Sequence, residues 1–349
     1  MKKLIEQLCA TLDHGEDLVL ATVCSQSGST PRVAGARMIV LRDGRIHGTI
    51  GGGLVEATAI REAADCFHSH RSRCHSFDLA NNDAAVTDMI CGGRMDCCLE
   101  YVPADQHNRA VFGELLRALQ SGRRAMLVSP LSGESGEARF VLDHKGRANG
   151  TVAPEPLLAA VRELRPSTSA ATILVAAGRD YLASSFAVGG TLYLVGAGHV
   201  AACTAEAAAR VGFRVVVLDD RAEFASRQRF PLADEVRVLA SFADCLPAAE
   251  IDSDSYLVIV TRGHLHDLEV LEQALRTPAG YIGMIGSRKK RNSIYTRLLD
   301  RGVTEAQLEQ VRCPIGMAIE ADTPEEIAVS IVGELIYQRA TGRKAWHLA

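Results

Sequence analysis

The stretch TLYLVGAGHVA, residues 191–201, decides the fold of the C-terminal half of this chain. Its first five residues predict a buried strand, and the alanine-rich segment from about 200 to 211 predicts a helix. Between them, Gly196 and Gly198 with Ala201 match the G-x-G-x-x-G/A fingerprint of a dinucleotide-binding turn. A strand, a glycine turn and a helix in this order predict a Rossmann-like domain.

The strands that follow this turn extend the prediction. Residues 214–218 form a second apolar strand, and Asp219 comes at the distance from the glycines at which an acid binds a ribose hydroxyl. Further strands are expected over 236–239, 256–260 and 281–285. Together they predict a doubly wound parallel sheet.

The candidate ligand-binding residues of this domain follow its strands, because ligands of such sheets lie outside the carboxyl ends of the strands. In the basic run 288–291, only Arg288 is expected to turn inward, while the other side chains face solvent. For His199 and for His264, a hydrogen-bonded structural role is the alternative. The predicted nucleotide site consists of Gly196, Gly198, His199, Asp219, Arg262 and Arg288, with His264 as a candidate general base.

A second glycine turn lies in the N-terminal half, where residues 48–56 read GTIGGGLVE. Gly51, Gly52 and Gly53 precede a predicted helix over 54–68. Such a turn presents backbone N–H groups and the positive end of the helix dipole to a phosphate. Glu56 falls in the first helical turn, where a carboxylate is favoured. A tight strand-to-helix turn without a ligand is the alternative interpretation.

Two arginines precede this turn. Arg32 ends the polar segment 28–32, and Arg37 ends the segment Gly35-Ala36-Arg37 before a hairpin over 38–47. The hairpin is expected to bring both arginines to the N-terminal glycine turn, around one anionic group. Arginine suits this task because its guanidinium binds phosphate through two parallel hydrogen bonds.

A cysteine followed by two glycines, Cys91-Gly92-Gly93, is the candidate reactive group. The glycines leave the thiol uncrowded, and Arg94 favours the thiolate, which is the form that binds metal or carries sulfur. The alternation after Arg94 predicts a strand with Cys97 in the core and Cys98 on the opposite face. The nearby residues Cys66, His68, His70, Cys74 and His75 match no zinc spacing and are expected at an exposed helix end.

Composition narrows the class of protein. The chain has 349 residues, a formal net charge of −4, and 47% hydrophobic residues, which indicates two well-packed domains. The charge excludes a nucleic-acid footprint, and no apolar run reaches the length of a bilayer span. Ten cysteines in a chain of this length are expected to be cytosolic thiols. We therefore predict a cytoplasmic protein with domains over 1–188 and 189–349.

The motifs of both halves resemble those of the xanthine dehydrogenase accessory factors of the XdhC/CoxI type. The resemblance covers most of the chain, and one departure is Glu320, which stands where the family has glycine. It rests on the segments 28–32, 35–37, 48–56, 91–93, 196–199, 313–317 and 323–328.

This resemblance implies a maturation factor for molybdenum hydroxylases. Members bind the molybdenum cofactor, as molybdopterin or its dinucleotide form, support its sulfuration, and insert it into xanthine dehydrogenase or an aldehyde oxidoreductase. The implied partners are that client, a cysteine desulfurase as sulfur donor, and a second copy of the chain. By the same resemblance, Cys91 contacts the metal or the sulfur in transit, and the N-terminal glycine turn holds the pterin phosphate.

Two other functions remain open at this point. One is an NAD(P)-dependent oxidoreductase, in which Gly196, Gly198 and Asp219 hold the cofactor and His264 is the base. The other is a non-catalytic protein that senses NAD(H). A cofactor chaperone is favoured over an enzyme, because the sequence offers no recognisable partner acid for hydride transfer.

Overall fold

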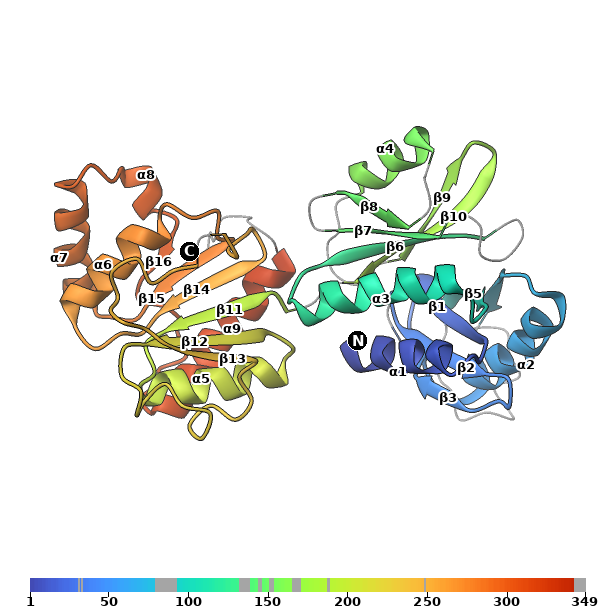
Figure 1. Cartoon of the computed structure of the whole chain (residues 1–349), viewed down its shortest axis with the longest axis horizontal. Coiled ribbons are helices and arrows are strands. Elements are labelled where there is room, and N and C mark those ends of the chain that lie inside the picture. Colours follow the sequence, from blue (N-terminus) through green and yellow to red (C-terminus); the bar gives the residue numbers. More distant parts are fainter. Residues whose placement is uncertain are drawn as a thin grey trace. The chain divides into compact units, whose positions relative to one another are not determined.

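The computed structural model describes residues 1–30, 32, 34–78, 93–131, 139–143, 146–150, 154–164, 171–186, 189–247 and 249–341. The chain divides into two compact units, Met1–Ala187 and Val188–Ala349 (Figure 1). We call them unit 1 and unit 2. The expected fold class is confirmed, since unit 1 has antiparallel sheets with helices and unit 2 has a parallel sheet.

The first sheet of unit 1 is antiparallel, with the strand order β3-β2-β1-β5-β4. One of its faces packs on helix α2 (Gly53–Ser69) through side chains such as Val19 and Leu99, and α1 (Lys2–Asp13) precedes β1. Cys97 lies fully buried in this core, as predicted. The strands are β1 (Leu18–Ser27), β2 (Arg37–Leu41), β3 (Ile46–Gly48), β4 (Arg73–Asp78) and β5 (Arg94–Val102).

A second antiparallel sheet of unit 1 has the order β8-β7-β6-β10-β9 and contacts the first sheet through residues such as Cys24 and Leu182. Its strand β10, which lies between β6 and β9, is not predicted from the sequence, because serines interrupt its apolar pattern although the strand interior is buried on both faces. The strands of this sheet and the two helices of the same part of the chain are α3 (Gln106–Gln120), β6 (Ala125–Pro130), β7 (Phe140–Leu142), β8 (Ala148–Gly150), α4 (Glu155–Glu163), β9 (Ala171–Ala176) and β10 (Arg179–Phe186).

Unit 2 holds one parallel sheet with the order β13-β12-β11-β14-β15-β16. Numbered along the chain this is 3-2-1-4-5-6, the doubly wound order of a Rossmann fold, whose direction of winding reverses between β11 and β14. The strands are β11 (Thr191–Val195), β12 (Arg214–Asp219), β13 (Glu235–Val238), β14 (Ser255–Ile259), β15 (Tyr281–Met284) and β16 (Val311–Arg312).

Helices cover both faces of this sheet, which is why the strands in its middle, such as β11 and β14, are mostly apolar. Side chains of α5 and α9 pack with Leu192 and Leu194 on one face, and those of α6, α7 and α8 pack with Tyr193 and Val195 on the other. The helices are α5 (His199–Arg210), α6 (His264–Ala274), α7 (Arg288–Leu299), α8 (Glu305–Leu308) and α9 (Pro324–Thr341). Within the described ranges, no helix is long and apolar enough to span a bilayer.

The segment before α9 follows the expected capping pattern. Thr323 Oγ1 accepts from the N–H of Glu326 at 3.2 Å, and Glu326 Oε2 accepts from the N–H of Thr323 at 3.1 Å. Glu320 adopts the left-handed backbone with φ of 55°. The conformation that favours glycine is therefore retained although glycine is absent.

The expectation of free thiols is wrong for two cysteines. Cys74 of β4 and Cys98 of β5 are cross-strand neighbours and form a disulfide, with 4.1 Å between their Cα atoms. Cys74 therefore lies in a strand and not at a helix end. Among the residues that the structure describes, no group of three or more His, Cys, Asp or Glu side chains is placed to hold a metal ion.

Candidate functional site

The motifs of unit 1 gather at one edge of its first sheet. Antiparallel pairing places the ends of β1, β3 and β4 beside the starts of β2 and β5. The segment 28–32 leaves β1 here, the N-terminal glycine turn leaves β3, and Arg37 begins β2. We call this the motif edge. Four segments far apart in sequence thus come to one place, since Gly93 precedes β5 there as well.

The N-terminal glycine turn is held by the carboxylate of Glu56. Glu56 Oε1 accepts from the N–H of Gly52 at 2.9 Å, from the N–H of Ile50 at 3.2 Å, and from the hydroxyl of Thr49. Gly51, Gly52 and Gly53 have φ of 140°, 75° and 52°, which explains why the turn is built from glycine. A side chain of the protein therefore occupies backbone donors that the sequence assigned to a phosphate.

The charge of Glu56 is stabilised by this arrangement. Burial would raise the pKa of Glu56, but the hydrogen bonds from Thr49, Gly52 and Ile50 outweigh it and lower the pKa below its usual value. The N–H groups of Gly53, Leu54 and Val55 begin helix α2 and have no partner inside the helix. These three donors remain for an anionic ligand, which would bind beside a carboxylate.

The two arginines predicted at this turn separate in the structure. Arg32 is exposed on the segment that leaves β1. Arg37 is only 3% exposed, and its guanidinium donates to the carbonyls of Gly35 at 3.1 Å and Ser185 at 3.0 Å, and lies 3.9 Å from the ring centre of Phe186. Arg37 thus joins the two sheets of unit 1, and this placement counts against a phosphate contact.

Cys91 and Gly92 lie outside the described residues, whereas Gly93, the last residue of their motif, is described. A Cβ atom on Gly93 would lie 2.5 Å from the carbonyl oxygen of Ser27 and 2.6 Å from that of Ser29. Only glycine permits this approach, so the last residue of the Cys91–Gly93 motif packs against the segment 28–32. The two motifs therefore meet at the motif edge.

The other thiols of the described chain are poor thiolates. Burial raises the pKa of Cys66 and Cys313 to about 11 and that of Cys24 to about 12. The remaining described free cysteines are shifted in the same direction, again mainly by burial: Cys9, Cys97, Cys203 and Cys245. A thiolate is the form that carries sulfur, so these residues are unsuited to that chemistry.

In unit 2, the C-terminal glycine turn links β11 to α5 as predicted. Gly196 has φ of 113°, and a Cβ atom there would lie 2.3 Å from the carbonyl oxygen of Val260. Gly198 has φ of −73°, and a Cβ atom there would meet nothing within 4 Å. Gly196 is therefore required by the fold, whereas Gly198 leaves open space at the first turn of α5, where His199 is exposed.

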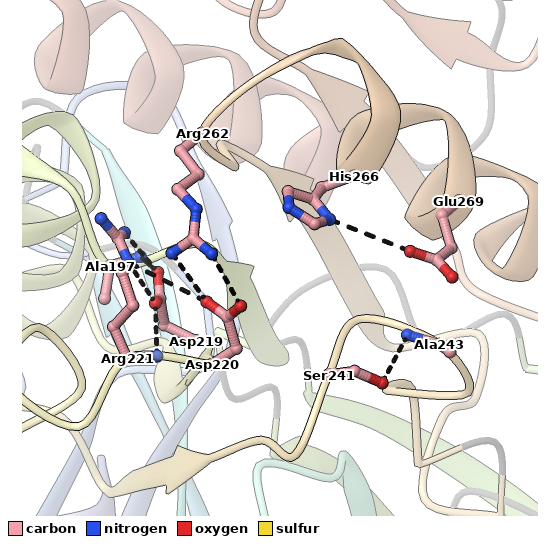
Figure 2. A network of polar contacts seen from close by, with 9 residues as sticks. All are labelled: Ala197, Asp219, Asp220, Arg221, Ser241, Ala243, Arg262, His266 and Glu269. Atoms are coloured by element: carbon pink, nitrogen blue, oxygen red, sulfur yellow. Dashed lines mark hydrogen bonds and ion pairs between the residues drawn. The ribbon is translucent and has the colours of Figure 1, made fainter.

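Asp219 was predicted to bind a ribose hydroxyl, but its carboxylate binds groups of the protein instead. Its side chain is 1% exposed and accepts from the N–H of Ala197 at 2.8 Å, and Arg221 binds it through a backbone N–H and two guanidinium nitrogens (Figure 2). Burial would raise the pKa of Asp219, but these donors outweigh it and lower the pKa. Asp219 thus ties the glycine turn to β12, and both of its oxygens already have partners.

The neighbouring acid, Asp220, pairs with an arginine of another loop, and its Oδ1 also lies 3.9 Å from Nε of Arg221. Asp220 Oδ1 and Oδ2 accept from the two terminal nitrogens of Arg262 at 3.0 and 2.9 Å (Figure 2). Arg262 follows β14, so the ion pair connects the loops on either side of β11. His264 begins α6 and is exposed.

The inward-facing basic residues of the run 288–291 are Lys290 and Arg291, which donates to the carbonyl of Cys313 at 3.3 Å, and not Arg288. Lys290 pairs with the fully buried carboxylate of Asp267 and donates to the carbonyl of Ile285 at 3.2 Å. Asp267 also accepts from the hydroxyl of Thr261 at 2.6 Å. Arg288 is exposed because it is the first residue of α7, and its Ser287 neighbour caps that helix. Helical spacing then turns Lys290 towards α6.

The predicted site thus omits several polar residues of this edge: Asp220, Arg221, Thr261, Asp267 and Lys290. One signal for Asp220 was present in the sequence, namely two successive acids at a strand end. Asp219 ends β12 and is buried behind the glycine turn, whereas Asp220 lies in the following loop and is 17% exposed. No comparable signal identifies Lys290 within a run of four basic residues.

Comparison with known protein families gives two matches. The XdhC and CoxI family matches residues 11–78, and the XdhC Rossmann domain matches residues 192–335. Together the matches span more than half of the chain and include the glycine turn of each unit.

Several proteins are similar over nearly the whole chain. The uncharacterized protein YqeB of Escherichia coli is 25% identical over 334 residues, and the chain spans 44% of its length. A probable xanthine dehydrogenase subunit of Bacillus subtilis is 27% identical over 336 residues, which are 95% of this chain and 96% of that protein. The molybdenum cofactor insertion chaperone PaoD of Escherichia coli is 23% identical over 330 residues, covering 93% and 84%.

A solved structure is similar over nearly the whole chain. The crystal structure of a xanthine dehydrogenase from Bacillus halodurans covers 99% of this chain, and this chain covers 98% of it. The TM-score is 0.73 at 26% sequence identity.

Proposed function

Since this chain belongs to the XdhC and CoxI family, we propose that it binds the molybdenum cofactor, supports its sulfuration and inserts it into a molybdenum hydroxylase. The observation that carries this proposal is the motif edge, where the segment 28–32, the N-terminal glycine turn and Gly93 come together. The names of two relatives point the same way, one to xanthine dehydrogenase and one to insertion of the molybdenum cofactor. Xanthine dehydrogenase or an aldehyde oxidoreductase is the proposed client.

Unit 1 is the proposed site for the cofactor as cargo. The first N–H groups of α2 suit the phosphate of the pterin, and the exposed Arg32 adds positive charge at the same edge. Glu56 holds the glycine turn in shape and keeps it rigid. Arg37 is left out of this site because its guanidinium already binds two carbonyl groups.

Cys91 is the proposed sulfur-handling residue. The described free cysteines have raised pKa values, so none of them offers a thiolate near neutral pH. Gly93, the last residue of this motif, packs on the segment 28–32 at the motif edge, and this contact supports the proposal. In this proposal a cysteine desulfurase supplies the sulfur, and the factor acts as a homo-oligomer.

Unit 2 is the proposed site for a nucleotide, either a free one or the nucleotide half of a dinucleotide form of the cofactor. The first turn of α5 is open, because a Cβ atom at Gly198 would meet nothing within 4 Å. The alternative, an oxidoreductase or sensor that uses NAD(P), makes a different prediction. It requires binding of NADH or NADPH to the purified protein without any need for molybdenum cofactor.

The test of the proposal uses the client as the readout. Cys91→Ser keeps the side-chain volume nearly constant but removes the thiolate. We expect the client hydroxylase to accumulate at full length but inactive, lacking molybdenum or its terminal sulfur. Molybdenum content and recovery of activity on chemical sulfuration distinguish these two defects. If the Cys91→Ser strain yields fully active client, Cys91 does not transfer sulfur, and the proposal has no other residue of this chain for that step.

The matched control for this variant is Cys97→Ser. Cys97 is fully buried in the core of unit 1, so its hydroxyl variant lowers the stability of this protein. We expect a lower melting temperature for Cys97→Ser and an unchanged one for Cys91→Ser. A loss of client activity in Cys91→Ser without a change in stability is therefore specific to the thiol.

A further inference from the structure

The ion pair between Asp220 and Arg262 lies at the reversal point of the unit 2 sheet. Asp220 directly follows β12, and Arg262 follows β14. In the strand order, β11 lies between these two strands, and it ends in the C-terminal glycine turn. The ion pair therefore connects the two loops that flank this turn, where a doubly wound sheet binds its ligand.

Asp219 is poorly suited to the ribose. Four hydrogen bonds converge on its two oxygens, one of them from the glycine turn itself through Ala197. With 1% exposure, the Asp219 side chain has no free face for a ligand hydroxyl. A ribose that bound Asp219 would have to displace Arg221, which also stacks 3.8 Å from the ring centre of Phe224.

Asp220 and Arg262 are accessible by comparison. The side chain of Asp220 is 17% exposed and that of Arg262 is 43% exposed. The carboxylate of Asp220 and the guanidinium of Arg262 form a bidentate pair, with two N–O distances of 2.9 and 3.0 Å. A carboxylate can exchange a guanidinium for a pair of hydroxyls, and a guanidinium can exchange a carboxylate for a phosphate with the same two-pronged geometry.

We propose that this ion pair stands in for a bound nucleotide, and that Asp220 binds the ribose hydroxyls while Arg262 binds a phosphate. The inference rests on the nucleotide site of the proposed function and names its recognition residues. The ligand class is a ribonucleoside diphosphate with a free 2′-hydroxyl. A 2′-phosphate is disfavoured, because it would lie beside Asp219 and Asp220.

Calorimetry with four adenine probes tests this assignment: ADP, 2′-deoxy-ADP, adenosine and adenosine 2′,5′-bisphosphate. For the parent protein we expect ADP to bind about tenfold more tightly than 2′-deoxy-ADP, as one hydroxyl bonded to a charged group provides. Adenosine 2′,5′-bisphosphate should bind more weakly than ADP. The same measurements with the corresponding cytidine nucleotides test whether the base matters, because the proposed contacts involve only the ribose and the phosphate.

Two variants separate the two ends of the pair. Asp220→Asn should remove the preference for ADP over 2′-deoxy-ADP and leave 2′-deoxy-ADP binding equal or tighter, since Arg262 is released. Arg262→Gln should weaken both diphosphates about tenfold and leave adenosine unchanged. Asp220→Glu should restore part of the ribose preference. A residue with only a structural role would lower all affinities together.

The control is Arg276→Gln, which removes an exposed arginine whose partner is Glu272 near the opposite end of α6. It should bind every probe as the parent does. If Asp219→Asn removes the ribose preference while Asp220→Asn keeps it, the assignment of Asp220 is wrong. If the parent binds neither diphosphate series, the nucleotide site of the proposed function falls and this inference falls with it. Retained cofactor handling in that case would show that unit 1 acts without a nucleotide.

Discussion

The two units each open a helix with a glycine turn, and in each turn a carboxylate accepts backbone N–H groups. In unit 1 the carboxylate is Glu56, which belongs to the helix that the turn begins. In unit 2 it is Asp219, which comes from the next strand and takes only the N–H of Ala197 within the turn. In unit 1 the carboxylate therefore links the glycine turn to its own helix, whereas in unit 2 it links the turn to a neighbouring strand.

This difference bears on which turn is open to an anion. Glu56 accepts from two backbone N–H groups and a hydroxyl of its own turn, so an incoming phosphate meets a carboxylate there. Asp219 lies behind the turn of unit 2, where its charge is matched by Arg221. The open space at Gly198 then faces the first turn of α5. The glycine turn of unit 2 is therefore less obstructed for an anion than the glycine turn of unit 1.

The largest expected effect comes from Gly196→Ala in unit 2. The added Cβ would lie 2.3 Å from a backbone oxygen, and the φ of 113° disfavours any side chain. We expect unit 2 to lose about 3 kcal/mol or more of its unfolding free energy, because backbone on both sides must move. Chemical denaturation with a probe in each unit measures this loss. Unchanged stability would mean that the turn is not packed against Val260 as described.

Asp219→Asn should have the next largest effect. The variant keeps the shape but removes the charge that binds Arg221, and we expect a loss of about 2–3 kcal/mol. Because the folded-state pKa of Asp219 is lowered, its contribution exists above the unfolded pKa of about 3.9 and is lost as pH falls through the folded value. The difference between parent and variant should therefore shrink in acid. A difference that grows in acid would contradict the lowered pKa.

Glu56→Gln should have a smaller effect of about 1 kcal/mol, since the amide oxygen still accepts from the turn. The folded-state pKa of Glu56 is also lowered, so this difference too should disappear as pH falls through that value. The informative readout is anion binding. If Glu56 occupies the anion site, the variant should bind inorganic phosphate more tightly than the parent does. Weaker phosphate binding would instead make Glu56 part of a site that needs its charge.

Gly198→Ala should have the smallest effect on stability, below about 1 kcal/mol, since the backbone is ordinary and the space is open. Its effect on nucleotide binding should be large, at least about tenfold, or 1.4 kcal/mol, because the methyl group lies where a phosphate approaches. Melting curves and calorimetry on one sample show both. Equal nucleotide binding by this variant and the parent would place the phosphate elsewhere.

Sequence patterns were sufficient where structure is local. The glycine turn at Gly196 and the strands β11 and β12 follow from neighbouring residues and were predicted. Contacts between residues far apart in the sequence could not be predicted from such patterns. Arg37 lies in the core because Ser185 and Phe186 come from β10, a strand that was not predicted.

The candidate site of unit 2 shows the same limit. Its position at the carboxyl ends of the strands was predicted, because strand order and motif spacing determine it. The different roles of Asp219 and Asp220 were not predicted, because they depend on the tertiary contacts of each carboxylate. The partner of Asp220 is Arg262, which is 42 residues away in the sequence. The inward position of Lys290 likewise depends on the buried Asp267 of α6.

The most direct test of the central claim is transfer of cofactor from this protein to its client. The protein is purified from cells that make the molybdenum cofactor, its bound pterin is measured by fluorescence after oxidation, and it is mixed with client hydroxylase that lacks cofactor. The account predicts bound pterin and a gain of client activity that depends on the added protein. A protein that carries no pterin and restores no activity, although the client responds to free cofactor, would contradict it.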